Sequence, residues 1–143
     1  MPLKAQVLGA LEKEVLQKFD FRLTGVTFID TMVGLAVGEN GKLIKSLDGG
    51  LTWSDQNSGT EENLLSIANT KSGVIFISGT NGLVLKSTNQ GSTWSKLDLG
   101  LSTDLFSLSI PHEDSVFLGS ESGKVLFSAN KGTTWSSIST AFS

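Results

Sequence analysis

Few side chains in this sequence have the chemistry of a catalytic or metal-binding group. The one histidine, His112, lies beside two acids in Pro111-His112-Glu113-Asp114, and another acidic pair occurs at Glu61-Glu62. A histidine next to carboxylates could ligate a metal ion or act in general acid–base catalysis. The pattern is more typical of a turn between strands, and both acidic pairs are expected on solvated loops. The sequence contains no cysteine, which excludes disulfides and thiolate metal sites.

Acid and amide side chains also recur at a fixed spacing. An eight-residue phrase that begins at Ser46 returns at Ser87 and again at Ser128, 41 residues later each time. Its third residue is Asp48 in the first copy and an asparagine in the other two. A calcium loop needs several oxygen-bearing side chains and usually a bidentate acid, whereas two of the three copies lack any acid. The sequence therefore favours a structural role, in which the Asp or Asn oxygen accepts hydrogen bonds from nearby backbone N–H groups.

The 41-residue period extends well beyond this phrase and divides most of the chain into three similar units. They cover 23–63, 64–104 and 105–143, and each opens on a leucine and carries a glycine just before an apolar pair. Four short β-rich runs separated by turn residues fit into each unit, which is the size of one propeller blade. The predicted fold is all-β, with three four-stranded antiparallel blades over 23–143 after a separate N-terminal segment, 1–22.

Turn residues predict where the strands of a blade begin and end. In the first unit, strands are expected at 23–28 and 34–37, and the repeated phrase forms the turn before the fourth strand. The segment Gly38-Glu39-Asn40-Gly41-Lys42 is faintly similar to a phosphate-binding loop, but it lacks the Walker spacing and the following Ser or Thr. Because Asn-Gly favours a tight turn between strands, a hairpin is expected there.

The repeated phrase resembles the Asp-box, also called the BNR repeat, whose pattern is Ser/Thr-x-Asp-x-Gly-x-Thr-Trp/Phe. The resemblance implies propeller blades of the kind found in photosystem II assembly factors, sialidases, sortilin-type receptors and some phage structural proteins. The tryptophans of the phrase are expected to pack between neighbouring hairpins. The matching residues, with two asparagines in place of Asp, are Ser46, Asp48, Gly50, Thr52, Trp53, Ser87, Asn89, Gly91, Thr93, Trp94, Ser128, Asn130, Gly132, Thr134 and Trp135.

The resemblance to sialidases covers the scaffold and not the active site. Sialidases use a tyrosine nucleophile and a cluster of three arginines, whereas this chain has no tyrosine and a single arginine, Arg22. No cofactor and no metal are expected, and the chain is predicted not to be an enzyme. Its net charge of −3 also argues against a nucleic-acid partner, which favours a basic surface.

The segment before the first unit is predicted to contain a short amphipathic helix over 3–19. Leu8, Leu11, Val15 and Phe19 follow the spacing of one helical face. This helix could pack on its own domain, act as a docking or oligomerisation helix, or lie on a membrane surface. The segment lacks the uncharged apolar centre of a signal peptide, and no apolar run is long enough to span a membrane. The expected location is therefore the cytoplasm or a virion.

Three blades are too few to close a propeller, because closed rings have about four to eight. Two copies could complete a six-bladed ring, the open stack could dock on another protein, or the N-terminal helix could plug one open face. The favoured function is a non-catalytic structural or assembly protein, such as a component of a phage capsid, tail or baseplate. The alternative is a carbohydrate- or protein-binding propeller module, such as a protein similar to photosystem assembly factors.

Overall fold

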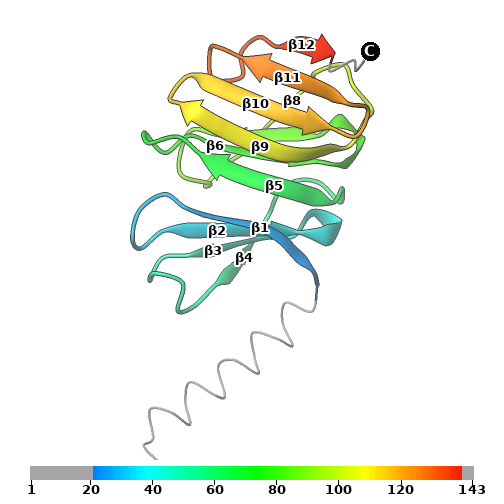
Figure 1. Ribbon diagram of the computed structural model, residues 1–143. Helices are drawn as coiled ribbons and strands as arrows, with labels where there is room; N and C mark the ends of the chain where they lie inside the picture. Colours follow the sequence, from blue (N-terminus) through cyan, green and yellow to red (C-terminus); the bar gives the residue numbers. More distant parts are fainter. Residues whose placement is uncertain (1–20, 140–143) are drawn as a thin grey trace, which may run out of the picture.

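The computed structural model of the protein describes residues 21–139. This part of the chain folds into three four-stranded antiparallel sheets, which confirms the predicted all-β fold and partial propeller (Figure 1). We call the three sheets blade 1, blade 2 and blade 3. Blade 1 contains β1 (Leu23–Phe28), β2 (Gly34–Gly38), β3 (Leu43–Ser46) and β4 (Ser54–Gln56). Blade 2 contains β5 (Leu64–Asn69), β6 (Ile75–Gly79), β7 (Val84–Ser87) and β8 (Ser95–Leu97). Blade 3 contains β9 (Leu105–His112), β10 (Ser115–Ser120), β11 (Lys124–Ser128) and β12 (Ser136–Ser139).

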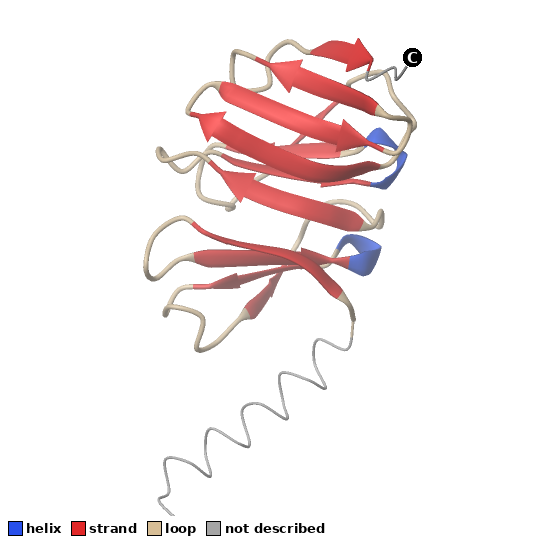
Figure 2. Cartoon of the chain, viewed as in Figure 1, coloured by secondary structure: helices blue, strands red, loops and turns tan. Residues whose placement is uncertain are grey.

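The strands of each blade follow one another in the sheet in the order of the chain. Every neighbouring pair is therefore an antiparallel hairpin. The blades are stacked face to face, and their first strands, β1, β5 and β9, lie side by side at one edge of the stack (Figure 2). Helix is confined in residues 21–139 to two short 3-10 turns, η1 (Glu39–Gly41) and η2 (Thr80–Gly82).

The turn after the second strand is tight in blades 1 and 2, as the Asn-Gly signal predicts. Asn40 and Gly41 have φ values of 58° and 71°, and the Gly38 N–H donates to the Lys42 carbonyl over 3.0 Å. Two successive residues with positive φ match the right-handed twist of the flanking strands, which is why Asn-Gly is favoured there. The segment Gly38–Lys42 is therefore a hairpin turn, as expected.

The prediction that Pro111 and His112 lie in a turn is wrong. Both residues belong to β9, and His112 pairs with Ser115 of β10, so that the turn is reduced to Glu113 and Asp114. Proline is tolerated here because β9 is the edge strand of its sheet, where a backbone N–H on the outer side has no ladder partner to lose.

The hydrophobic core of the described region lies between the blades. A stack of repeats buries its apolar surface mainly against neighbouring repeats, so each blade contact forms a core of its own. The blade 1–2 core consists of Leu35, Val37, Leu43, Leu64, Ile67, Ile75, Ile77, Leu83 and Leu85. The blade 2–3 core consists of Phe76, Val84, Leu105, Val116, Leu118 and Leu126.

The predicted N-terminal helix lies outside the described residues, together with Leu8, Leu11, Val15 and Phe19. Its role as a plug, a docking helix or a membrane-surface helix therefore stays a prediction. Within residues 21–139, there is no helical segment with the length and hydropathy needed to cross a bilayer.

Candidate functional site

The three Asp-box turns connect the third and fourth strands of their blades and share one hydrogen-bond pattern. In blade 1, the Ser46 hydroxyl donates to Asp48 Oδ1 over 2.8 Å and accepts the Gly50 N–H over 2.9 Å. Asp48 Oδ1 also accepts the backbone N–H of Thr52 over 2.9 Å. Gly50 has φ 94° and the equivalent glycines have 86° and 85°, a region that favours glycine. Each turn is thus closed by its own side chains.

Asparagine reproduces this turn in blades 2 and 3 with one reversed bond. Asn89 Oδ1 accepts the Thr93 N–H over 2.9 Å, as Asp48 does with Thr52. The Asn89 amide then donates to the Thr93 hydroxyl over 2.7 Å, whereas in blade 1 the Thr52 hydroxyl donates to Asp48 over 2.5 Å. Asn130 makes the same two bonds with Thr134, over 2.8 and 2.9 Å. The amide therefore keeps the acceptor for the threonine N–H, as the sequence predicts, but it loses the charge and donates to the threonine hydroxyl instead of accepting from it.

The carboxylate of Asp48 is stabilised in its ionised form by these donors. The pKa of Asp48 is lowered to about 2, chiefly by the hydrogen bond from the Thr52 hydroxyl, then by the Thr52 N–H and the Ser46 hydroxyl. Because three donors of its own turn bind this carboxylate, its role in the structure is to stabilise the turn. Within the described residues, no group of three or more His, Asp or Glu side chains could hold a metal ion.

The indoles of the phrase lie at blade contacts in two of the three blades. Trp94 packs against the blade 1–2 core, and Trp135 packs against the blade 2–3 core. Trp53 belongs to the first blade and lies instead against Phe28 of its own blade, with ring centroids 6.1 Å apart. The Nε1 groups of Trp53 and Trp135 each donate over 2.9 Å to the carbonyl of the phrase glycine, Gly50 and Gly132. The buried Nε1 of Trp94 has no hydrogen-bond partner.

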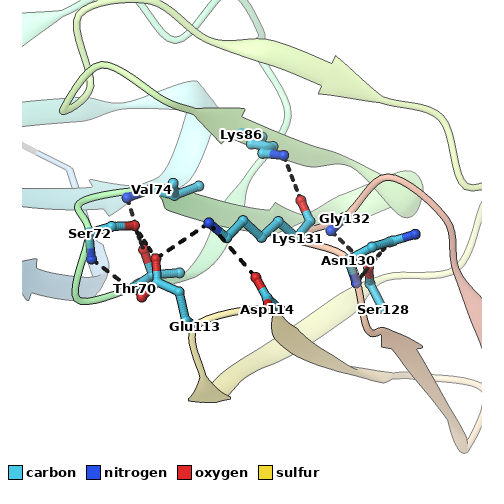
Figure 3. Close-up of polar contacts among 10 residues, drawn as sticks. All are labelled: Thr70, Ser72, Val74, Lys86, Glu113, Asp114, Ser128, Asn130, Lys131 and Gly132. Carbon is cyan, nitrogen blue, oxygen red and sulfur yellow. Dashed lines mark hydrogen bonds and ion pairs between the residues drawn. The ribbon is translucent and has the colours of Figure 1, made fainter.

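A polar cluster joins the loops of blades 2 and 3 (Figure 3). The Ser72 hydroxyl, in the turn before β6, donates to Glu113 in the turn before β10. The Lys131 ammonium lies 3.7 Å from Glu113 Oε1 and 3.8 Å from Asp114 Oδ1. The hydrogen bond from the Ser72 hydroxyl is the main cause of the lowered pKa of Glu113, and the charge of Lys131 lowers it further. Glu113 and Asp114 are therefore not simply solvated acids, which corrects the expectation for this pair.

Lys86 extends the same cluster from β7. Its ammonium donates to the Lys131 carbonyl over 2.6 Å and lies 5.7 Å from the centroid of the Phe76 ring. Burial is the main cause of the lowered pKa of Lys86, and the nearby charge of Lys131 adds to it. Two lysines, two acids and a serine from both blades thus meet at one blade contact, where they fix the relative position of the loops.

The second acidic pair is also only partly free in solvent. Glu61 is exposed, but Glu62 accepts hydrogen bonds from the Thr80 hydroxyl and from the Asn81 amide, the latter over 3.0 Å. The hydrogen bond from Thr80 is the main cause of the lowered pKa of Glu62, followed by that from Asn81. The sequence offered no signal for this contact, because the partners lie 18 and 19 residues away in a turn of the same blade.

The predicted candidates for chemistry do not converge. His112 is exposed at the end of β9, whereas Asp48 closes a turn of blade 1 and Glu62 braces a turn of blade 2. The acids are instead bound to hydroxyl, amide and ammonium groups that hold turns and blades together. This arrangement stabilises a scaffold.

Comparison with known proteins agrees with this picture. The sequence matches the family described as Photosynthesis system II assembly factor YCF48 over residues 10–141. The chain belongs to this family. The family match confirms the resemblance to BNR-type propellers that the repeated phrase indicated. No curated protein sequence matches the chain.

Solved structures show the same fold in longer proteins. A structure of YCF48 bound to a D1 peptide has a TM-score of 0.74 and 22% identity, and the match covers 82% of this chain and 39% of that chain. YCF48 from Cyanidioschyzon merolae has a TM-score of 0.72 and 19% identity, with the same coverage of 82% and 39%. An ancestral GH74 enzyme has a TM-score of 0.66 and 24% identity over 80% of this chain and 18% of that enzyme. The matched part of this chain therefore spans 39% of the length of each YCF48 chain and 18% of the GH74 enzyme.

These matches also change the order of the predicted functions. None of them supports the predicted role in a phage virion. The family favours the alternative, a protein-binding propeller of the assembly-factor kind. Because an assembly factor and an enzyme both share this fold, likeness of fold does not distinguish between the two classes.

Proposed function

We propose that this chain is a non-catalytic, protein-binding propeller module that assists the assembly of a protein complex. The observation that carries the proposal is membership of the YCF48 family over residues 10–141. A solved YCF48 structure contains a bound D1 peptide, and we propose that this chain likewise recognises a peptide segment of a partner protein.

The surface of the described region supports a protein partner. Large apolar side chains are exposed on the outer blades, among them Val26 and Met32 on blade 1 and Phe106 and Ile138 on blade 3. Exposed apolar side chains of this size are available for contact with a protein partner. Carbohydrate recognition stays the second candidate, because the sequence predicted it as an alternative and a GH74 enzyme shares the fold.

A non-catalytic role is supported by the way in which the acids are used. Glycoside hydrolysis generally requires two carboxyl groups that face one another across a substrate. Here Asp48, Glu62 and Glu113 each accept hydrogen bonds from the protein's own turns, which lower their pKa values. A general acid needs the opposite shift, a raised pKa.

The proposal is tested by measuring peptide binding to the full chain. The chain is immobilised and titrated with a D1 peptide, and with a scrambled peptide of the same composition as the control. We expect saturable binding of the D1 peptide and none of the scrambled peptide. Equal responses to the two peptides, or no saturable response, would overturn the proposal. Saturable binding to a glycan array without peptide binding would favour the carbohydrate alternative instead.

A further inference from the structure

The period of 41 residues allows the Asp-box turns of the three blades to be compared position by position. At the second and sixth positions of the phrase, blade 1 has Leu47 and Leu51, which are 67% and 77% exposed. The serine hydroxyl accepts the glycine N–H in all three turns, over 2.8 to 2.9 Å, so the turn itself does not require leucine at these positions. The equivalent residues of the other two blades are smaller: Thr88, Ser92, Ala129 and Thr133.

A neighbouring blade does not cover these two positions. Blade 2 packs against a preceding blade and a following blade, and both contacts contain a hydrophobic core. Its residues at the two positions, Thr88 and Ser92, are nevertheless exposed. The exposure of Leu47 and Leu51 is therefore a property of the turn, and a further blade before blade 1 would leave both leucines in solvent.

A third large apolar side chain comes from the adjoining turn between β1 and β2. Met32 is 50% exposed, and its carbonyl accepts the N–H of Gly49 in the Asp-box turn over 2.9 Å. This bond joins the two turns, which lie at the same end of blade 1 (Figure 1). The equivalent residues of the other blades are Gly73 and Asp114. Exposed apolar side chains that gather at one place indicate an interaction site.

Two carboxylates belong to the same pair of turns. Asp30 Oδ1 accepts the Met32 N–H over 2.8 Å. Asp48 directly follows Leu47 and accepts the Thr52 N–H over 2.9 Å. We call the surface formed by these turns the blade 1 tip, and it consists of Asp30, Met32, Leu47, Asp48 and Leu51.

The charges of the blade 1 tip are not balanced by the described part of the chain. The ion pairs formed within residues 21–139 involve Glu39, Glu113 and Asp114, and neither Asp30 nor Asp48. A partner of the blade 1 tip would therefore meet apolar side chains beside two negative charges, which favours a partner with apolar and basic groups. The other blades have no acid at the positions of these two carboxylates, where they carry Lys71, Asn89, His112 and Asn130.

We propose that the blade 1 tip binds an amphipathic, basic segment of a partner protein. Apolar side chains of the segment pack on Met32, Leu47 and Leu51, and its lysine or arginine side chains lie near Asp30 and Asp48. An amphipathic helix with a basic polar face carries both kinds of group on one short segment. This inference rests on the proposed function, because it names the surface that binds a peptide segment and the chemistry of that segment.

The experiment uses a labelled model peptide built only from leucine and lysine in the pattern of an amphipathic helix. The full chain is titrated into the peptide, and binding is followed by fluorescence anisotropy. Leu47→Thr/Leu51→Ser gives blade 1 the residues of blade 2, so its turn should fold as the turn of blade 2 does. Leu23→Thr is the matched control, because Leu23 is half exposed and pairs with Gly38 at the other end of the β1–β2 hairpin.

We expect saturable binding to the wild type and to Leu23→Thr, with the same affinity. Binding to Leu47→Thr/Leu51→Ser should be at least about tenfold weaker, because the apolar contacts of two leucines are lost. Asp30→Asn/Asp48→Asn keeps both amide oxygens as acceptors and removes both charges. This second variant should bind several-fold more weakly at low salt, and the difference from the wild type should shrink at high salt. Circular dichroism and Tm check that each variant is folded.

Two further peptides separate the possible outcomes. A peptide with glutamate in place of lysine should not bind, and equal binding of it would overturn the inference, as would an unchanged affinity of Leu47→Thr/Leu51→Ser. The D1 peptide is titrated in parallel. Binding of the D1 peptide without binding of the leucine–lysine peptide would overturn the assignment to the blade 1 tip and leave the proposed function standing. Binding of neither peptide would overturn both.

Discussion

Replacing Phe76 with alanine removes the largest fully buried side chain of the blade 2–3 core. The ring lies against Gly132 of the next blade and below the Lys86 ammonium, which is 5.7 Å from the ring centroid. Phe117→Ala makes the same chemical change at the equivalent position of blade 3. There the ring is half-buried and contacts Phe127. The two variants therefore differ in what surrounds the ring.

The expected loss of stability follows from this difference. Deleting a buried Phe side chain costs about 3–5 kcal/mol, because transfer and cavity terms add. Loss of the cation–π contact with Lys86 adds about 0.5–1 kcal/mol. Phe117 keeps part of its ring in water and has no blade contact of this kind, so we expect a smaller loss of about 1–2 kcal/mol. For a chain of this size these values correspond to a fall in Tm of roughly 10–20 °C for Phe76→Ala and about 5 °C for Phe117→Ala.

The assay is urea unfolding followed in parallel by tryptophan fluorescence and circular dichroism. Both variants are measured at the same low protein concentration, so that association between chains does not add to the stability. Coincident transitions of the two probes would justify a two-state free energy. An equal or larger loss for Phe117→Ala would refute the assignment of inner and outer blade faces on which the reasoning rests.

Other predictions concern the turns. Gly132→Ala should destabilise the chain by at least about 2 kcal/mol for two reasons. The new Cβ would lie 2.8 Å from Phe76 Cε1, and a positive φ is strained for alanine. Gly59→Ala is the control, because its φ is also positive, at 78°, but nothing lies within 4 Å of the new Cβ. Similar losses of unfolding free energy for the two variants, measured in urea, would contradict the close contact between Gly132 and Phe76. Asp48→Asn reproduces the turn chemistry of the other two blades, so Tm at pH 7 should change by no more than about 2 °C. The pKa of Asp48 is lowered from 3.8 to about 2, so its contribution to stability is complete above pH 3.8 and is lost as the pH falls toward 2. Calorimetry should therefore show a shallower fall of Tm in this pH window for Asp48→Asn than for the wild type, and parallel curves would show that the carboxylate does not contribute.

The repeated phrase made the blades predictable because its interactions are local. Ser46, Asp48 and Gly50 bond to one another within one turn, so their types and spacing carry the geometry. Asn-Gly in the turn between the second and third strands also specifies its turn locally, through backbone conformation alone. The indole positions were predictable for Trp94 and Trp135, because each belongs to a blade that follows another blade.

Contacts between blades depend on which surfaces meet, and that information is spread over residues far apart in the chain. The bond from Ser72 to Glu113 joins equivalent positions of successive blades, 41 residues apart, but the period alone does not indicate that these two side chains meet. No sequence signal marked Lys86 near the carbonyl of Lys131, or the extension of β9 to His112. Equivalent residues such as Val26 and Ile67 have nearly the same apolar character and the same register, yet one is exposed and the other is buried. Repetition along the chain specifies each blade through short-range hydrogen bonds, whereas the end faces of the stack are defined only when the blades pack, because burial depends on a neighbour.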